Sequence, residues 1–330
     1  MARILLTHPT PARRLYYGDA AVEGLGVLGE LRLNEGDGPL DGMRLINAAR
    51  GCDIVVSDRT APGAPELFQS LPDLVAFVRC AVDTRNVDVE AASRAGVLVT
   101  RASAGFAPAV SELIIGFMVD LARGITRASG EYRAGRAPKI VMGRQLYGST
   151  LGIIGYGAIG RHLADVGLAF GMRVLVSDPF APIVREGIDR VELDALLTRA
   201  DFVVCLAVAN ERTENLIGAD ALARMKRGAF FVNASRGNLV DEAALAAALD
   251  EHRIAGAAID VGREADQMPS PALAARSDVI ATPHVGGLTP EAASHQAHET
   301  VRQVAEIVSG RVPPGALNPE RATRIARLAR

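Results

Sequence analysis

Short apolar runs alternate with longer segments of helical spacing along most of the chain. The runs in the N-terminal third are RILLTH, DIVVSD, LVAFVRC and GVLVT, with segments rich in Gly, Pro and Asp between them. This alternation is typical of parallel strands joined by crossover helices. The pattern therefore predicts an α/β protein with doubly wound parallel sheets.

The rest of the chain repeats the pattern more regularly. Its strand candidates are LGIIG, RVLVSD, FVVCLAV, AFFVNAS, GAAID and DVIATPH. Apolar spacing predicts a helix from Pro108 to about Arg127, with Gly124 as an interruption near its end. DEAALAAALDEH predicts a helix capped by Asp241, and one more helix follows Thr289 with no strand after it. This central set of β–α units, flanked by material that does not belong to it, predicts one domain inserted within another.

A glycine-rich turn lies between the first two of these later strands. The strand LGIIG is followed by Gly155, Gly157 and Gly160, then by an amphipathic segment and a strand that ends on Asp178. The first glycine allows a tight turn, the second lets the backbone approach a diphosphate, and the third brings the helix close to its strand. Asp178 stands where a carboxylate can bind an adenosine ribose. The order predicts a dinucleotide site, with a purely structural turn as the alternative.

Composition excludes several classes of function. The chain has 330 residues, 22% of them charged, and a net charge of −2, so no basic excess indicates nucleic acid or a membrane surface as a partner. Cys52, Cys80 and Cys205 are scattered and in no metal-ligand spacing, which favours free buried thiols and no metal site. No apolar run approaches the roughly 18 residues of a membrane span, and the apolar part of MARILLTHP is too short for a signal peptide, so we expect neither. We expect a cytoplasmic protein.

Three polar residues stand at the ends of later strand candidates. Arg236 follows AFFVNAS, Asp260 ends GAAID, and His284 ends DVIATPH. Ligands of parallel sheets bind at the carboxyl ends of the strands, so these side chains are candidates for one site. Hydride transfer to a carbonyl needs a proton donor, which histidine supplies near neutral pH, and a cationic fork for an anionic substrate. The structural alternatives are a surface salt bridge for Arg236, a loop cap for Asp260 and a plain loop residue for His284.

The sequence resembles the D-isomer-specific 2-hydroxyacid dehydrogenases over nearly its whole length. The matching segments are VRCAVDTRNVDVEAASRAGVLVT, AVSELIIGFMVDLAR, LGIIGYGAIGRHLADVGLAFGMRVLVSDP, MKRGAFFVNASRGNLVDEAALAAALDEHRIAGAAIDV and the TPHVGGLT run. The resemblance implies a Rossmann NAD-binding domain (103–288) inserted into a smaller flavodoxin-like substrate domain (1–102 and 289–330). It also implies catalysis in the cleft between them and a homodimer.

The resemblance assigns roles residue by residue. Arg236 resembles the family's substrate-orienting arginine and His284 its acid/base, while Asp260 resembles the aspartate on the nicotinamide side of the coenzyme. The coenzyme-binding positions that it implies are Gly155, Gly157, Ala158, Ile159, Gly160, Asp178, Ala207, Ser235, Asp260 and Gly287.

One departure from the family concerns the partner of His284. The family usually has a glutamate five residues after the aspartate of GAAID, and this chain has Ala265 there. Glu264 and Asp266 flank that position. We favour Glu264 as the carboxylate that stabilises the imidazolium, with Asp266 or neither as the alternatives.

A second departure lies in the loop that would bind the substrate carboxylate. Where the family commonly has G-x-G, this chain has Ala81, Val82 and Asp83, so the expected substrate-binding residues are Val82, Asp83 and Arg236. Two like charges 4 Å apart repel by about 4 kcal/mol at an effective dielectric near 20. Three explanations remain open: Asp83 points away, Arg85 compensates its charge, or the substrate is unusual.

The sequence thus predicts an NAD-dependent oxidoreductase that interconverts a 2-keto acid and a D-2-hydroxy acid. Asp178 favours NAD over NADP because it would repel a 2′-phosphate. One alternative is a 3-phosphoglycerate dehydrogenase-like activity, with Arg59, Arg79 and Arg101 as phosphate ligands. The other is a non-catalytic NAD(H)-sensing regulator on the same scaffold.

Overall fold

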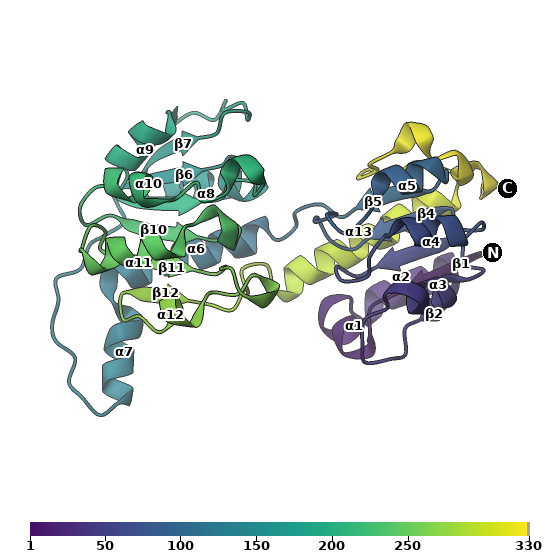
Figure 1. Cartoon of the computed structure of the whole chain (residues 1–330), viewed down its shortest axis with the longest axis horizontal. Coiled ribbons are helices and arrows are strands. Elements are labelled where there is room, and N and C mark those ends of the chain that lie inside the picture. The colour runs from purple at the N-terminus through teal and green to yellow at the C-terminus, as the bar shows by residue number, and fades with distance from the viewer. Residues whose placement is uncertain (329–330) are drawn as a thin grey trace. The chain divides into compact units, whose positions relative to one another are not determined.

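The computed structural model describes residues 1–328 and divides into two compact units (Figure 1). The first unit comprises Met1–Gly105 with Thr289–Arg330, and the second comprises Phe106–Leu288. The sequence predicted the first boundary between the two domains after residue 102, three residues before the boundary in the structure. Ser103 stays with the first unit because its main-chain N–H and its hydroxyl both donate to Oε2 of Glu299, each at 2.7 Å.

The first unit contains a five-stranded parallel sheet in the order β2-β1-β3-β4-β5. Its strands are β1 (Ala2–Leu6), β2 (Gly29–Leu33), β3 (Ile54–Ser57), β4 (Ala76–Arg79) and β5 (Leu98–Arg101). This is the flavodoxin-like order, as expected. The four predicted strands are confirmed, but β2 was missed: GELRL is an edge strand whose polar positions are exposed, so its apolar signal is weak.

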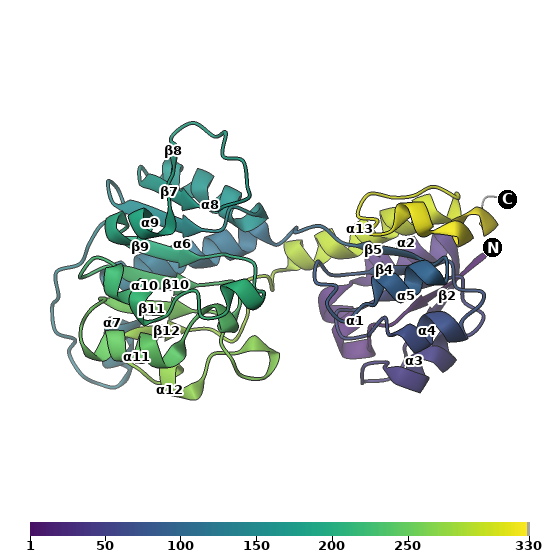
Figure 2. The ribbon, with the colours of Figure 1, turned by 45° about the horizontal axis from the view of Figure 1, so that its top comes forward.

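Helices cover both faces of this sheet (Figure 2). They are α1 (Thr10–Tyr16), α2 (Asp19–Leu28), α3 (Gly42–Ala49), α4 (Pro65–Ser70), α5 (Val89–Arg94) and α13 (Pro290–Val308). Alternate strand residues face opposite sides: Leu5 and Val55 pack under α3 and α4, while Ile4 and Val56 pack under α2 and α13. The burial of both faces explains why these strands are almost continuously apolar.

The second unit contains a seven-stranded parallel sheet in the order β12-β11-β10-β9-β6-β7-β8. Its strands are β6 (Thr150–Ile154), β7 (Arg173–Ser177), β8 (Ile188–Arg190), β9 (Phe202–Cys205), β10 (Phe230–Asn233), β11 (Gly256–Ile259) and β12 (Val279–Ala281). The six predicted strands are confirmed. The seventh, β8, was missed because it is a three-residue edge strand with no buried residue. The order reverses between β6 and β9, which is where a doubly wound sheet binds a nucleotide.

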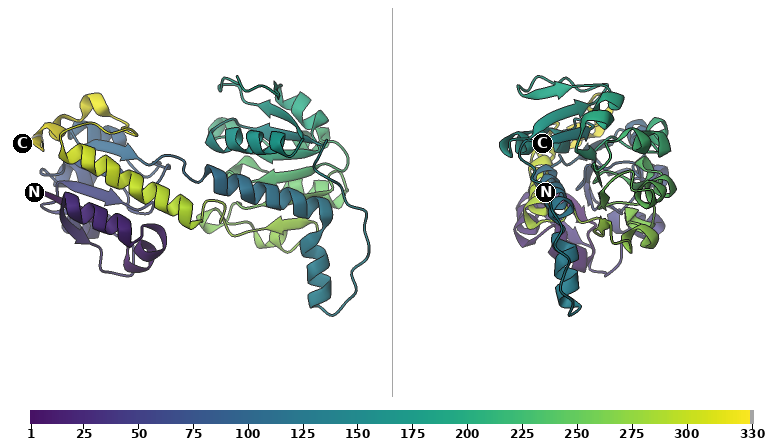
Figure 3. Two further views of the ribbon diagram at one scale, coloured as in Figure 1. Left: turned by 180° about the vertical axis from the view of Figure 1, so that it is seen from behind. Right: turned by 90° about the vertical axis from the view of Figure 1, so that its left-hand side faces the viewer.

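The second unit has helices α6 (Ala107–Arg123), α7 (Ile125–Arg133), α8 (Ala158–Ala169), α9 (Leu193–Arg199), α10 (Ala219–Arg224), α11 (Glu242–Asp250) and α12 (Pro271–Ala274). The predicted helix from Pro108 divides at Gly124, whose φ of +63° ends α6. Asp241 caps α11 as predicted, since its Oδ1 accepts from the N–H groups of Ala243 and Ala244 at 3.0 Å. In Figure 3, α7 and the chain after it extend away from the body of this unit.

Short 3₁₀ turns complete the chain at η1 (Glu211–Thr213), η2 (Gly237–Leu239), η3 (Ala265–Gln267), η4 (Pro319–Arg321) and η5 (Thr323–Arg327). The three cysteines are free and buried. Among residues 1–328, no helix is long and apolar enough to cross a membrane.

Candidate active site

The glycine turn joins β6 to the N-terminus of α8. Gly155 has a φ of +99°, and a Cβ there would lie 2.5 Å from the carbonyl oxygen of Leu206. A Cβ on Gly160 would lie 2.3 Å from the carbonyl oxygen of Gly155, so the third glycine lets the helix approach its strand. A Cβ on Gly157 would meet nothing within 4 Å. The first and third glycines are therefore required by the fold, whereas the second keeps space open beside the turn.

That open space lies at the N-terminus of α8, where Gly157 is the N-cap. The N–H groups of Ala158 and Ile159 lie in the first helical turn and have no acceptor within the helix. Together with the helix dipole they attract negative charge. These residues fit the diphosphate of a dinucleotide, because its oxygens would occupy the space that a side chain at residue 157 would fill.

Asp178 ends β7 beside the glycine turn and is held by main-chain donors. Its carboxylate accepts from the N–H groups of Tyr156 at 2.7 Å, Phe180 at 2.8 Å and Ala181 at 2.9 Å. Burial raises the pKa of Asp178, but these donors and the nearby Arg190 outweigh it, and the pKa lies below its ordinary value. Asp178 is thus a fixed negative charge at the position expected for the ribose.

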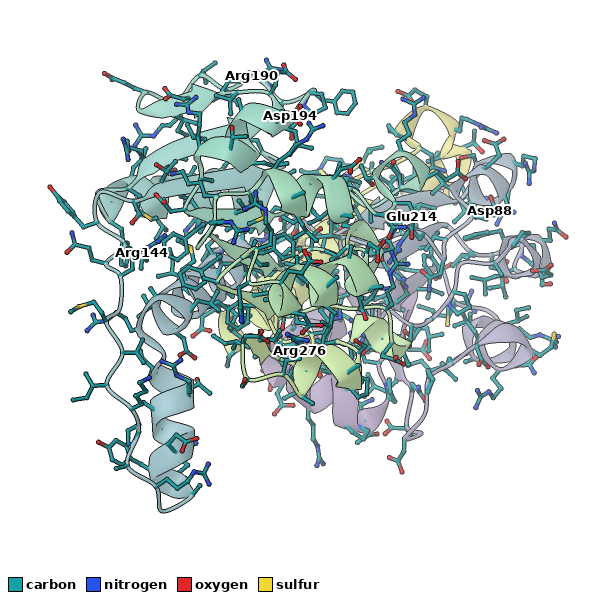
Figure 4. All side chains as sticks on the ribbon, turned by 60° about the vertical axis from the view of Figure 1, so that its left-hand side comes forward. Asp88, Arg144, Arg190, Asp194, Glu214 and Arg276 are labelled. Atoms are coloured by element: carbon teal, nitrogen blue, oxygen red, sulfur yellow. The ribbon has the colours of Figure 1, made fainter. Side chains whose placement is uncertain are left out.

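Arg190 is a neighbour of Asp178 that sequence reasoning missed. It comes from β8 and is labelled in Figure 4. Its Nη2 donates to the carbonyl oxygens of Asp178 at 3.1 Å and Pro179 at 3.3 Å. The only available signal was the run IDR, which is too short and polar to predict a strand. Residues 179–182, which follow Asp178 directly, carry no charge, but the fold places the Arg190 cation beside it.

The ends of β9 and β10 meet next to the glycine turn. The Ser235 hydroxyl donates to the carbonyl oxygen of Ala207 at 2.7 Å, and the Asn233 amide donates to that of Arg236 at 3.0 Å. Arg236 in turn donates from Nη1 to the carbonyl oxygen of Ser235 at 2.7 Å. The structure therefore brings Ala207 next to Ser235 and Arg236, from which it is distant in sequence.

Asp260 shapes the loop that carries His284. It is 3% exposed, and its carboxylate accepts from the Thr282 hydroxyl at 2.6 Å and from the N–H groups of Val285 and Gly286, both at 2.8 Å. The loop-cap alternative describes these contacts. A Cβ on the next residue, Gly287, would lie 3.4 Å from the Cβ of Phe106.

His284 does not have the hydrogen-bond partner that the sequence favoured. Its Nδ1 lies 2.8 Å from the main-chain carbonyl oxygen of Asp266, while the side chain of Glu264 is exposed. The expectation of a Glu264 carboxylate partner is therefore not met in this structure. The reason is local: the left-handed backbone of Asp266 (φ 55°, ψ 26°) accompanies a turn in which its carbonyl reaches the imidazole.

The loop expected to bind the substrate carboxylate lies after β4 in the first unit. Arg85 Nη2 lies 2.6 Å from Oδ2 of Asp83, and Arg85 Nε donates to both carboxylate oxygens at 3.0 Å. Of the three explanations for Asp83, compensation by Arg85 is the one that this geometry supports. The main-chain N–H groups of Ala81, Val82 and Thr84 donate to no acceptor within residues 1–328.

Arg79 cannot serve as a phosphate ligand. It is 1% exposed, and its guanidinium donates to the carbonyl oxygens of Asp58, Ala61, Arg59 and Asp83 at 2.5–3.1 Å and to the side chain of Asn86. Its donors are thus used to hold two loops together. Of the three arginines proposed for a phosphate, only Arg59 and Arg101 are exposed. Residues 1–328 contain no cluster of three or more His, Cys, Asp or Glu that could hold a metal ion.

Residues 115–286 match the family model of the D-isomer specific 2-hydroxyacid dehydrogenase NAD binding domain. The chain is 33% identical to a glyoxylate reductase from Korarchaeum cryptofilum over 302 residues, which cover 88% of this chain and 90% of that protein. It is 32% identical to a D-3-phosphoglycerate dehydrogenase from Methanocaldococcus jannaschii, covering 96% of this chain but only 60% of the relative. The NAD⁺ complex of D-lactate dehydrogenase from Lactobacillus jensenii has a TM-score of 0.82 at 26% identity, covering 96% and 99% of the two chains.

The nucleotide-binding turn and the strand-end residues thus define an oxidoreductase of the Rossmann type. The chain belongs to the D-isomer specific 2-hydroxyacid dehydrogenase family. It is an NAD-dependent dehydrogenase of 2-hydroxy acids, and its second unit contains the NAD-binding domain.

Proposed function

We propose that the protein interconverts a small 2-keto acid and its D-2-hydroxy acid, with His284 as the acid/base and Arg236 as the substrate-orienting residue. One observation carries the proposal: Arg236 and His284 follow β10 and β12, which flank β11 in the sheet that holds the glycine turn. Both residues therefore lie at the carboxyl end of the same parallel sheet.

The roles follow from the chemistry of carbonyl reduction. Bound NADH supplies the hydride. The imidazolium of His284 donates a proton from Nε2 to the alkoxide oxygen that forms, and the neutral imidazole accepts it in the reverse direction. The guanidinium of Arg236 offers a planar fork that binds the carboxylate and polarises the carbonyl oxygen.

The loop after β4 supplies the second set of carboxylate-binding groups. The N–H groups of Ala81, Val82 and Thr84 are available donors, and Arg85 neutralises the charge of Asp83. An uncompensated Asp83 would repel the substrate by about 4 kcal/mol at 4 Å. The ion pair supports an ordinary anionic 2-keto acid as the substrate.

Small substrates are favoured over phosphorylated ones. A 3-phosphoglycerate dehydrogenase-like activity would need a phosphate site, and Arg79 is buried with its donors bound to loop carbonyls and Asn86, which leaves only two of the three candidate arginines. Asp178 supports preference for NADH over NADPH, since its carboxylate would repel a 2′-phosphate.

We further propose that the protein is a homodimer and that it is cytoplasmic. Free buried cysteines fit a cytoplasmic location.

The proposal is tested by a screen of NADH oxidation. Its substrates are glyoxylate, hydroxypyruvate, pyruvate, phenylpyruvate, longer 2-keto acids and phosphohydroxypyruvate. We expect turnover with one or more small 2-keto acids. His284→Asn should lower kcat by about 10²- to 10⁴-fold because it removes the proton donor. Asparagine tolerates the left-handed φ of +55° at this position.

The matched control is His252→Asn. His252 is exposed, lies in the same unit and also has a left-handed φ, +51°. It should retain wild-type turnover. Absence of turnover with every keto acid would favour the NAD(H)-sensing regulator instead, and equal losses in the two variants would contradict the role of His284.

A further inference from the structure

The segment Gly262–Met268 after β11 forms a turn with an unusual backbone. Asp266 and Gln267 are consecutive non-glycine residues with left-handed φ angles of 55° and 62°. Such angles are uncommon outside glycine and cluster where the surroundings impose them, often at functional sites. His284 (φ 55°) also has a left-handed backbone.

The turn is closed by its own main chain. The Gly262 N–H donates to the carbonyl oxygen of Gln267 at 2.7 Å, and the Glu264 N–H donates to that of Met268 at 3.1 Å. The Gln267 N–H donates back to the carbonyl oxygen of Glu264 at 3.0 Å. A Cβ on Gly262 would lie 2.6 Å from the carbonyl oxygen of Met268, so the closure requires glycine at its first residue.

The turn is also anchored to the segment that carries Arg236. A Cβ on Gly237 would lie 1.9 Å from the carbonyl oxygen of Gly262, so the two segments touch through their backbones. The Gly237 N–H donates to Oε1 of the Gln267 side chain at 3.3 Å. Gln267 therefore links the turn to the residue immediately after Arg236.

Arg263 fixes the beginning of the turn to the same neighbour. Its Nε and Nη2 donate to the carbonyl oxygen of Val240 at 3.2 and 3.1 Å. Its Nη2 also lies 2.9 Å from the carboxylate of Glu214, which is labelled in Figure 4. The turn is thus held both against the chain that follows β10 and against Glu214, which precedes that strand.

The far side of the turn holds His284. Nδ1 of His284 lies 2.8 Å from the carbonyl oxygen of Asp266. A carbonyl oxygen only accepts hydrogen bonds, so Nδ1 must carry a proton. In the neutral imidazole this leaves Nε2 as the unprotonated nitrogen, which is the one available to a substrate.

We propose that the turn Gly262–Met268 positions both reacting side chains, and that Gln267 is its key positioning residue. The carbonyl of Asp266 takes the orienting place that a carboxylate would occupy, and the Gln267 carboxamide sets the distance between the turn and Arg236. The inference rests on the proposed roles of His284 and Arg236, and it assigns a function to residues that have none so far.

The charged groups around His284 are consistent with orientation by a carbonyl. The carboxylate of Asp260 is occupied by the Thr282 hydroxyl and two loop N–H groups. Glu264 and Asp266 come from the turn, and Arg236 comes from the neighbouring strand end. Because Nδ1 of His284 contacts the Asp266 carbonyl, the proposal predicts which ring nitrogen of His284 carries the proton in the neutral imidazole.

Side-chain ¹⁵N–¹H correlation spectra of ¹⁵N-histidine-labelled protein measure that tautomer without any turnover. His284→Asn identifies the His284 signals among the six histidines of the chain. We expect a neutral imidazole protonated on Nδ1. A neutral form protonated on Nε2 would overturn the proposal.

Three substitutions then separate backbone from side chain. Gln267→Val places a β-branched residue at a φ of 62°, which it does not tolerate, so the turn must rearrange. We expect kcat to fall at least tenfold, the pH–rate profile to change and the Nδ1–H tautomer to be lost. Gln267→Gly keeps the left-handed backbone but removes the carboxamide, so KM for the keto acid should rise severalfold while the tautomer is retained.

His252→Val is the matched control. It introduces the same valine at an exposed position outside the turn that also has a left-handed φ, 51°, and wild-type kinetics and tautomer are expected. Identical behaviour of Gln267→Val and His252→Val would refute the positioning role. If the wild type reduces no keto acid, the proposed function fails, but the tautomer measurement still decides this inference.

Discussion

At the scale of single residues, buried polar groups hold the carboxyl end of the first sheet together. Arg79 ends β4 and joins the loops after β3 and β4 through their carbonyl groups. His8 follows β1, is 3% exposed and lies with its ring 4.9 Å from that of Tyr17. These residues have structural roles, which their polar character alone did not reveal.

Arg79→Met should destabilise the first unit by about 3–5 kcal/mol, because several buried carbonyl groups would lose their hydrogen-bond donor. The control is Arg85→Met in the same loop, whose side chain is 67% exposed in its pair with Asp83. An exposed ion pair contributes only about 0–1 kcal/mol. Hydrogen exchange of the β4 amides measures the difference, and equal losses in the two variants would argue against the carbonyl-binding role.

Acidification should destabilise the first unit through His8. Burial lowers the pKa of His8 from 6.5 to about 4, so between these values the unfolded chain binds the proton and the folded chain does not. The stability that neutral His8 contributes to the folded unit is complete above pH 6.5 and is lost as the pH falls towards 4. The free energy of unfolding should fall by about 1.4 kcal/mol per pH unit over this range, about 3 kcal/mol in all. Hydrogen exchange of the β1 amides at several pH values measures it. His8→Gln should flatten this slope, and an unchanged slope would point to other groups.

At the scale of elements, the β6–α8 turn separates two uses of glycine. Gly160 is required by packing, because its Cβ would lie 2.3 Å from a carbonyl oxygen, whereas a Cβ on Gly157 meets open space. The same pattern G-x-G-x-x-G thus contains a residue that the fold needs and a residue that the ligand needs.

Gly160→Ala should therefore lower stability by about 1–3 kcal/mol through overpacking. Gly157→Ala should leave stability within about 0.5 kcal/mol of wild type. Its NADH dissociation constant should nevertheless rise at least tenfold, because the methyl group fills the space of the diphosphate. Thermal unfolding and NADH titration of both variants test this, and tight NADH binding by Gly157→Ala would contradict the diphosphate site.

At the scale of the whole molecule, α7 and the chain after it are poorly packed against their own unit, since no residue from 125 to 145 is buried. No residue of α7 is buried, and Ile140 and Met142 in the following chain are 97% and 95% exposed. Apolar side chains exposed together mark an interaction surface. We assign this surface to the proposed homodimer.

Sedimentation velocity should show a dimer for the wild type and a monomer for the double variant Ile140→Asp/Met142→Asp, because buried unpaired carboxylates oppose association. Val27→Asp on α2 is the control, since Val27 is also exposed (81%) but lies outside this segment. A wild-type monomer, or a double variant that stays dimeric, would rule out this interface.

The sequence by itself determined the two α/β units, the dinucleotide turn and the strand-end residues. The reason is that buried parallel strands are continuously apolar and that Gly155, Gly157 and Gly160 meet local backbone demands. The apolar pattern of the sequence did not predict the edge strands β2 and β8, because short, half-exposed strands contain few apolar residues.

Only the tertiary structure decided what His284 and Asp83 contact. The Asp266 carbonyl reaches His284 because the backbones of Gly237 and Gly262 touch and the intervening turn adopts left-handed angles. The neutralisation of Asp83 likewise depends on the curve of one loop, which brings Arg85 back onto it. Sequence spacing shows which groups are present, but their orientation depends on packing between segments that are distant along the chain.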